Sequence, residues 1–135
     1  MGMDVCGRNP TSDAGKYFRA SVWSWRPIQS LIYELCRDLL DEETLAGIGF
    51  NSGAGPADQA TCTKMAARFA LWMEHHVDGH KVDLGMNVAP DGRLLFGEEI
   101  ADHPDLEYET AHQVDDDHLK EWIEFLRHCG GFEVW

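Results

Sequence analysis

The spacing of apolar residues constrains the fold of this sequence more than any other feature. In three stretches apolar residues recur three and four positions apart, as on one face of an α-helix. One further stretch alternates apolar with polar residues, as a strand with one buried face does. At 135 residues the chain has the size of one domain. We therefore predict a single α+β domain over residues 1–135, with three amphipathic helices packed on a small, mainly antiparallel sheet.

The three predicted helices have recognisable ends. The first begins at Pro27, because proline is favoured at the first helical position, and ends within residues 41–49, where two glycines interrupt it. The second covers residues 56–76 and the third residues 115–128, with aspartates at the start of the third and basic residues at its end. The apolar stripes are Ile28, Leu31, Ile32, Leu35, Cys36 and Leu39, then Cys62, Met65, Ala66, Phe69, Ala70 and Met73, then Leu119, Trp122, Ile123 and Leu126.

The predicted sheet is built around one hairpin. Residues 81–88 alternate as a strand, residues 89–92 form a turn with Pro and Gly in suitable positions, and residues 93–96 return as the second strand. The terminal pieces, residues 1–5 and 132–135, are short and alternating. Because a lone hairpin is marginally stable in water, we expect both termini to pair with it.

The charge distribution is uneven. Residues 98–117 carry nine carboxylates and no Lys or Arg, residues 1–37 have a net charge of +2, and the whole chain has a net charge of −13. A negative surface of this kind suits a host protein with a basic surface, such as one that grips nucleic acid, and it opposes direct binding to DNA. The alternative is a solvated connection with favourable charges at a helix start. The expected partner-binding residues are Glu98, Glu99, Asp102, Asp105, Glu107 and Glu109.

A second candidate site interleaves arginine with aromatic residues over residues 17–27. Guanidinium groups beside indole faces can stack and can bind anions with two hydrogen bonds, which suits a small anionic ligand or a nucleotide. Alternatively, the tryptophans belong to the core and the arginines pair with the chain's own acids. The candidate ligand-binding residues are Arg19, Trp23, Trp25 and Arg26, with Asn51 from the Gly-rich turn before the second helix.

Other chemistry has little support in the sequence. The four cysteines lie far apart with no Cys-x-x-Cys, so we expect reduced thiols rather than a disulfide framework or a zinc site. The seven histidines include no His-Glu-x-x-His, and no Gly-x-Ser-x-Gly occurs. We therefore expect no metal, no cofactor and no catalytic residue, although enzymatic activity is not excluded.

The sequence constrains the cellular location and the oligomeric state less than it constrains the fold. No apolar stretch is long enough to cross a bilayer and no secretory signal is evident, so we expect a cytoplasmic protein that does not bind membranes. Surplus tryptophan surface, such as Trp72 or Trp135, leaves a symmetric oligomer as a third hypothesis. The sequence does not fix the oligomeric state.

Both ends of the chain carry recognisable motifs. The start reads Met-Gly-Met-Asp-Val-Cys-Gly, then Pro-Thr-Ser over residues 10–12, Tyr-Phe-Arg over residues 17–19 and Trp-Ser-Trp-Arg-Pro over residues 23–27. The end reads Phe-Leu-Arg-His-Cys-Gly-Gly-Phe over residues 125–132. These motifs resemble an uncharacterised family of small bacterial and bacteriophage proteins, in which an aromatic residue usually stands at the position of Cys6. The resemblance implies no activity, but it implies a phage or mobile-element origin and an accessory or host-interaction role. Together with the acidic charge, the sequence therefore predicts a non-enzymatic acidic binding protein.

Overall fold

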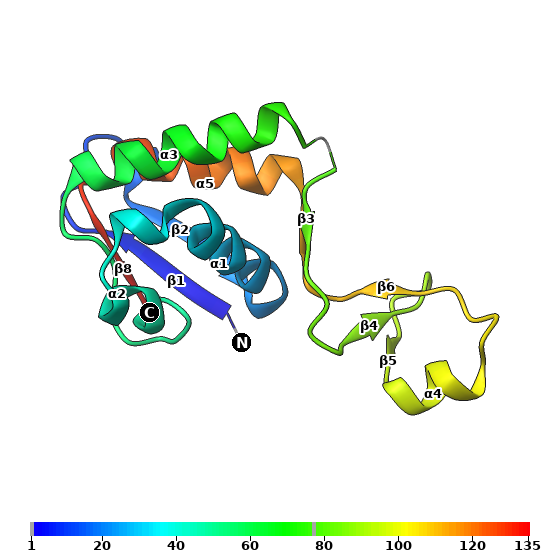
Figure 1. The fold of residues 1–135 in the computed structure, drawn as a ribbon. Coiled ribbons are helices and arrows are strands. Elements are labelled where there is room, and N and C mark those ends of the chain that lie inside the picture. The colour runs from blue at the N-terminus through cyan, green and yellow to red at the C-terminus, as the bar shows by residue number, and fades with distance from the viewer. Residues whose placement is uncertain (1, 77) are drawn as a thin grey trace.

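The computed structural model describes residues 2–76 and 78–135 and confirms the α+β fold with antiparallel sheets. Most of the helices and the longest strands form one body, while a smaller group of elements extends from it (Figure 1). We call residues 83–110 the arm. The joint between arm and body is formed by β3 (His80–Lys81) and β7 (Gln113–Val114), which pair antiparallel.

The three predicted helices are present as α1 (Val22–Cys36), α3 (Gln59–Glu74) and α5 (Asp116–His128). Their apolar stripes face the core, as the helical spacing predicted. Gly130 and Gly131, both with positive φ, follow the end of α5 and allow the chain to turn into the last strand. Shorter helices complete the set: α2 (Glu42–Gly47), α4 (Gly97–Asp102) and the single turns η1 (Asp13–Gly15) and η2 (Arg37–Leu39).

Both ends of α1 were predicted wrongly: the helix ends at Cys36 rather than within residues 41–49, where the separate helix α2 lies. This helix begins at Val22 rather than at Pro27, because the side-chain oxygen of Ser21 accepts a hydrogen bond from the backbone N–H of Ser24 (3.3 Å) and caps the first turn. Pro27 lies inside the helix and is buried. The correction places Trp23 and Arg26 on the first turns of a helix instead of on the loop before it.

The main sheet has the strand order β2-β1-β8, with both neighbouring pairs antiparallel. Its strands are β1 (Gly2–Gly7), β2 (Tyr17–Ser21) and β8 (Phe132–Val134). The termini therefore pair with each other, and the prediction that they pair with the hairpin is wrong. The physical reason is β2, which the sequence analysis did not recognise as a strand and which covers β1 along its length.

The core is organised around Trp122 on α5, which has no exposed surface. Its ring lies 5.6 Å from that of Trp25 on α1 and 6.2 Å from that of Phe69 on α3, both edge-on. It also packs on Phe18 of β2 and Phe132 of β8, with ring centroids 5.1 and 5.5 Å away. One aromatic side chain thus connects three helices and the sheet, an arrangement that is favourable beyond the area it buries.

The predicted hairpin exists, but in a separate sheet within the arm. This sheet has the order β5-β4-β6, and Gly92, with φ of +88°, donates its N–H to the carbonyl of Ala89 (2.9 Å) in the turn. Its strands are β4 (Asn87–Val88), β5 (Leu94–Leu95) and β6 (Glu109–Thr110). A continuous strand over residues 81–88 was predicted wrongly, because Gly85 adopts φ of +86° and its N–H bonds the Asp83 carboxylate (3.1 Å).

The arm contributes nothing to the core of the body. Within the described residues, the main hydrophobic cluster and the side chains packed against it include no residue from 78 to 113. The arm has its own small centre at Leu95, which is fully buried. The body therefore holds a complete core without the arm.

Candidate functional site

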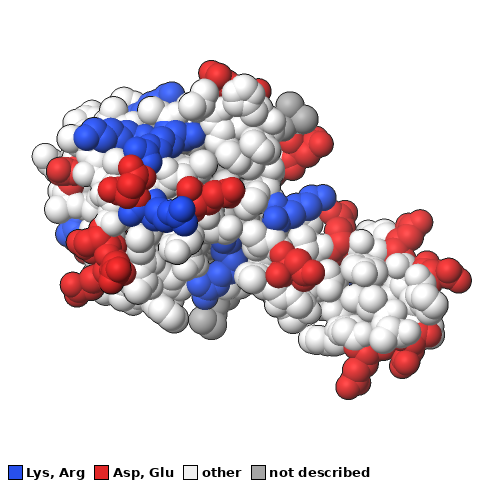
Figure 2. All heavy atoms as spheres, viewed as in Figure 1, with Lys and Arg blue, Asp and Glu red and all other residues white. Residues whose placement is uncertain are grey.

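The arm carries most of the surplus negative charge. Residues 83–110 contain eight carboxylates and one arginine, a net charge of −7 within a chain of −13. The other residues contain sixteen carboxylates and ten Lys or Arg, so they account for −6 over a much larger surface. On the face seen in Figure 2, the outer end of the arm shows Asp and Glu side chains, while the visible Lys and Arg side chains lie on the body and at the joint.

Four of the six predicted partner-binding carboxylates are free of ion pairs. Glu99 pairs with Arg93 (2.8 Å) and Glu109 pairs with Lys81 (3.1 Å). Within the described part of the chain, no ion pair includes the remaining four, all of them exposed: Glu98, Asp102, Asp105 and Glu107. Because no cation of the described residues pairs with them, the negative charges of these four side chains act on approaching molecules.

The arm also exposes large apolar side chains that the sequence analysis missed. Leu84, Leu94, Phe96 and Tyr108 are each between 39% and 56% exposed. Leu94 and Phe96 flank the buried Leu95, so the alternation of a strand could have identified them as facing outward. No local signal identifies Tyr108. Exposed apolar side chains beside charged ones are typical of surfaces that bind other proteins.

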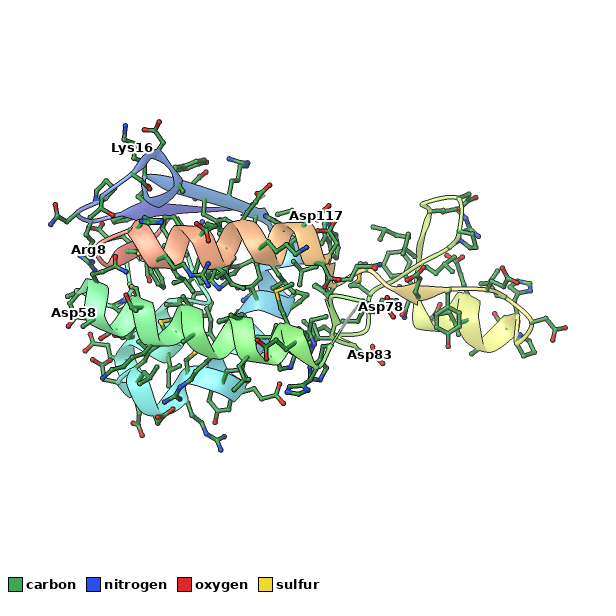
Figure 3. All side chains as sticks on the ribbon, turned by 90° about the horizontal axis from the view of Figure 1, so that it is seen from above. Arg8, Lys16, Asp58, Asp78, Asp83 and Asp117 are labelled. Atoms are coloured by element: carbon green, nitrogen blue, oxygen red, sulfur yellow. The ribbon has the colours of Figure 1, made fainter. Side chains whose placement is uncertain are left out.

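The joint is held by a short antiparallel ladder and by side chains. The N–H of Val82 donates to the carbonyl of His112 (3.0 Å), and the Thr110 hydroxyl donates to the carbonyl of Val82 (2.6 Å). The His112 ring packs against Trp23 of α1, with ring centroids 5.0 Å apart. Figure 3 shows Asp78 and Asp83 at this joint and Asp117 on the neighbouring start of α5. Polar bonds and ring packing therefore position the arm.

Two histidines at the joint are shifted toward their neutral forms. Burial, and then the positive charge of Arg26, lower the pKa of His112. Burial also lowers the pKa of His80, against the opposing effect of Glu34. Neither Nδ1 of His112 nor Nε2 of His80 has a hydrogen-bond partner among the described residues. The joint is thus built for uncharged imidazoles.

This arrangement predicts a loss of stability in mild acid. A histidine whose pKa is lowered by folding binds a proton more readily in the unfolded chain. Its contribution to the free energy of unfolding is therefore complete above the unfolded pKa of about 6.5 and is lost as the pH falls below that value. His112→Phe keeps a ring against Trp23 and removes the titrating group. We expect the thermal midpoint of this variant to fall less between pH 7 and pH 5 than that of the wild type. His103→Gln, at an exposed position of the arm, is the control and should follow the wild type; equal slopes for all three proteins would contradict the prediction.

The predicted arginine–aromatic site is not assembled. Trp25 is fully buried in the core and donates its indole N–H to the carbonyl of Ile48 (2.8 Å). Asn51 donates to the carbonyl of Gly2 (3.2 Å) and to that of Trp135, so it links the two ends of the chain. These two side chains serve the fold, and their polar groups are already bonded.

The other members of that set lie at different places. Arg19, on β2, forms an ion pair with Asp4 on the neighbouring strand (2.9 Å). Trp23 packs at the joint, and Arg26 lies beside the loop that follows α2, where its Nη1 donates to the carbonyl of Gly49 (3.0 Å). Arg19 therefore behaves as the alternative interpretation predicted, by pairing with the chain's own acids, whereas Arg26 does not.

Packing explains three of the four cysteines and Trp72, but not Trp135. All four cysteines are free thiols, and Cys36, Cys62 and Cys129 are buried. Burial raises the pKa of the Cys36 thiol to about 12. Trp72 packs against the core and stacks on His76 with ring centroids 4.1 Å apart. Trp135, at the end of the chain, is 49% exposed, so the oligomer hypothesis stays a prediction.

Comparisons with protein-family models, with curated proteins and with solved structures gave no match to this chain. Among the described residues, no cluster of three or more His, Cys, Asp or Glu side chains could hold a metal ion. In the same part of the chain, no helix combines the length and apolar character needed to span a membrane. The resemblance to small bacterial and bacteriophage proteins stays a prediction.

Proposed function

We propose that this chain is a cytoplasmic, non-enzymatic binding protein whose acidic arm engages a partner protein with a basic surface. The observation that carries the proposal is the arm itself, with its net charge of −7 outside the core of the body. Opposite charge accelerates the encounter of two proteins and excludes partners of the wrong sign.

The apolar side chains of the arm support a protein partner over a simple counterion. Phe96 and Tyr108 are about half exposed, on the segments that carry Glu98 and Glu107. Aromatic side chains contribute much of the affinity of protein interfaces, whereas exposed charge pairs contribute little each. In this proposal the carboxylates guide the partner to the arm and the aromatic side chains hold it there.

A partner that normally grips nucleic acid fits this chemistry, because such a protein already presents Lys and Arg to a dense row of negative charges. The arm would then compete with nucleic acid for the same surface. An accessory role in a phage or mobile element accords with the predicted resemblance and belongs to the same proposal. Direct binding of this chain to DNA is disfavoured by its charge.

Affinity capture from a bacterial lysate tests the proposal. The immobilised wild type should retain a basic protein, and the complex should dissociate as the salt concentration rises from about 0.1 M to about 1 M, since the Debye length falls from about 10 Å to about 3 Å. Neutralising the four unpaired carboxylates (Glu98→Gln, Asp102→Asn, Asp105→Asn, Glu107→Gln) should weaken binding at least about fourfold, because each exposed pair contributes roughly 0.2–1 kcal/mol.

A matched control changes the same amount of charge on the body. Glu42, Glu43, Glu74 and Glu121 are exposed and form no ion pair among the described residues. Their replacement by Gln should leave the amount of captured partner within about twofold of the wild type, because in this proposal the partner binds the arm and not these positions of the body. Equal weakening by both sets of substitutions would mean that only net charge matters, and salt-independent capture would reject the electrostatic proposal.

A further inference from the structure

A pocket lies at the base of the arm, between the body and the segment that leads into the arm. Its volume is about 520 Å³, within the usual range for small-molecule sites. One side is a stripe of polar residues on α1, at the spacing of one helix face, and the other sides are apolar residues from the region of α2 and from the segment before β4. The lining residues are Arg26, Gln29, Ser30, Tyr33, Leu45, Ile48, Val82 and Leu84.

Arg26 is held in place at this pocket. Its Nη1 donates to Oε1 of Gln29 (2.8 Å) and to the carbonyl of Gly49 (3.0 Å). A Cβ at Gly49 would lie 2.6 Å from the amide nitrogen of Gln29, so the glycine leaves room for the side chain that orients Arg26. A guanidinium fixed in this way loses little conformational freedom when it binds an anion.

The charge of Arg26 is not balanced by a carboxylate. Within the residues that the structure describes, no Asp or Glu oxygen lies within 4.0 Å of Arg26, and its Nε and Nη2 make no hydrogen bond. The chain contains 24 carboxylates against 11 Lys and Arg, and seven of those eleven cations pair with one of them. A half-buried arginine left unpaired in so acidic a chain is available for an external anion.

We infer that this pocket binds a small monocarboxylate with an apolar or aromatic body. The carboxylate would accept two hydrogen bonds from the free edge of Arg26, and the body would lie against Leu45, Ile48 and Val82. A single guanidinium neutralises one charge, and the net charge of −13 disfavours polyanions such as nucleoside phosphates. The Ser30 and Tyr33 hydroxyls add hydrogen-bonding groups on the same wall. This binding site is separate from the charged surface of the arm.

Phenylbutyrate and its neutral amide, phenylbutyramide, form a matched pair of probes. Titration of the full chain, followed by backbone amide NMR shifts, should show saturable binding of the acid with a Kd on the order of 1 mM or tighter. The shifts should concentrate at Gln29, Ser30, Leu45 and Val82. The amide should bind at least about tenfold more weakly, since it cannot form the charge-assisted pair. Equal affinity of acid and amide, or shifts outside the pocket, would overturn the inference.

Two variants distinguish the contribution of Arg26 to ligand affinity from that of the cavity. Arg26→Gln should reduce the affinity for phenylbutyrate to that of the amide, whereas Lys64→Gln, which makes the same charge change at an exposed position of α3, should bind like the wild type. Ser30→Phe keeps the arginine and fills the cavity, so it should also abolish binding. Wild-type affinity in either Arg26→Gln or Ser30→Phe would contradict the assignment, whatever protein the arm binds.

Discussion

Replacement of residues 83–111 by an Asn-Gly turn is expected to leave a folded protein that no longer captures the basic partner. The joint makes this deletion possible, because His80 pairs with Val114 and Lys81 with Gln113 in an antiparallel ladder. The bond from Val82 to His112 extends that ladder by one pair. A two-residue Asn-Gly turn can therefore close it as a hairpin.

The free energy of unfolding should change by no more than about 2 kcal/mol in this variant. The hydrophobic core keeps every described member, since no residue from 78 to 113 belongs to it. The hydrogen bond from Thr110 to Val82 is lost and the packing of Trp23 on His112 is kept, while a much shorter loop favours folding by on the order of 1–2 kcal/mol. Urea unfolding measures the stability and lysate capture measures binding. A variant that fails to fold would show that the arm supports the core, and a folded variant that still binds the partner would reject the arm as the site.

Replacement of Trp122 by Ala should have the largest effect on stability. Its ring packs on side chains from α1, α3, β2 and β8, and removal of a buried aromatic side chain costs about 3–5 kcal/mol. Small domains are stable by only about 5–15 kcal/mol, so this variant should unfold at much lower urea concentration or be partly unfolded in water. Far-UV circular dichroism during urea titration measures the change.

Two further substitutions serve as controls for that effect. Trp122→Phe should cost only about 1–2 kcal/mol, because a ring remains and the substitution removes an indole N–H that has no partner among the described residues. Trp135→Ala, at a half-exposed position, should stay within about 0.5 kcal/mol of the wild type. Equal losses for Trp122→Ala and Trp135→Ala would contradict the central place of Trp122 in the core.

The sequence predicted the helices well where local signals agreed with burial. In α5 the apolar stripe and the aspartates at residues 115–117 indicated the observed start. The predicted start of α3 at residue 56 is three residues early, because Asp58 caps a helix that begins at Gln59. In α1 two signals disagreed: Pro27 indicated a start, but the cap at Ser21 determined it. Proline tolerates the interior of a helix when its lost bond is outweighed by packing, and packing cannot be read from local sequence.

The arrangement of the sheets and the arm was less predictable. Residues 17–21 were taken for a binding cluster, and their pairing with β1 depends on contacts distant in sequence. Gly85 interrupts an alternating run that otherwise has the pattern of one strand. The separation of the arm from the core depends on which apolar residues pack together, and this cannot be read from local sequence. The exposure of Phe96 could be expected from the alternation around Leu95, whereas that of Tyr108 had no local signal. The excess of acidic residues was visible in the sequence.

Hydrogen–deuterium exchange of the full chain, alone and bound to the captured partner, tests most directly where the partner binds. The account predicts that partner binding slows exchange mainly within residues 83–110, especially around α4 and the segment that carries Glu107 and Tyr108. The main sheet and α3 should exchange at the same rates with and without partner. Protection on the main sheet or α3, with the arm unchanged, would contradict the account.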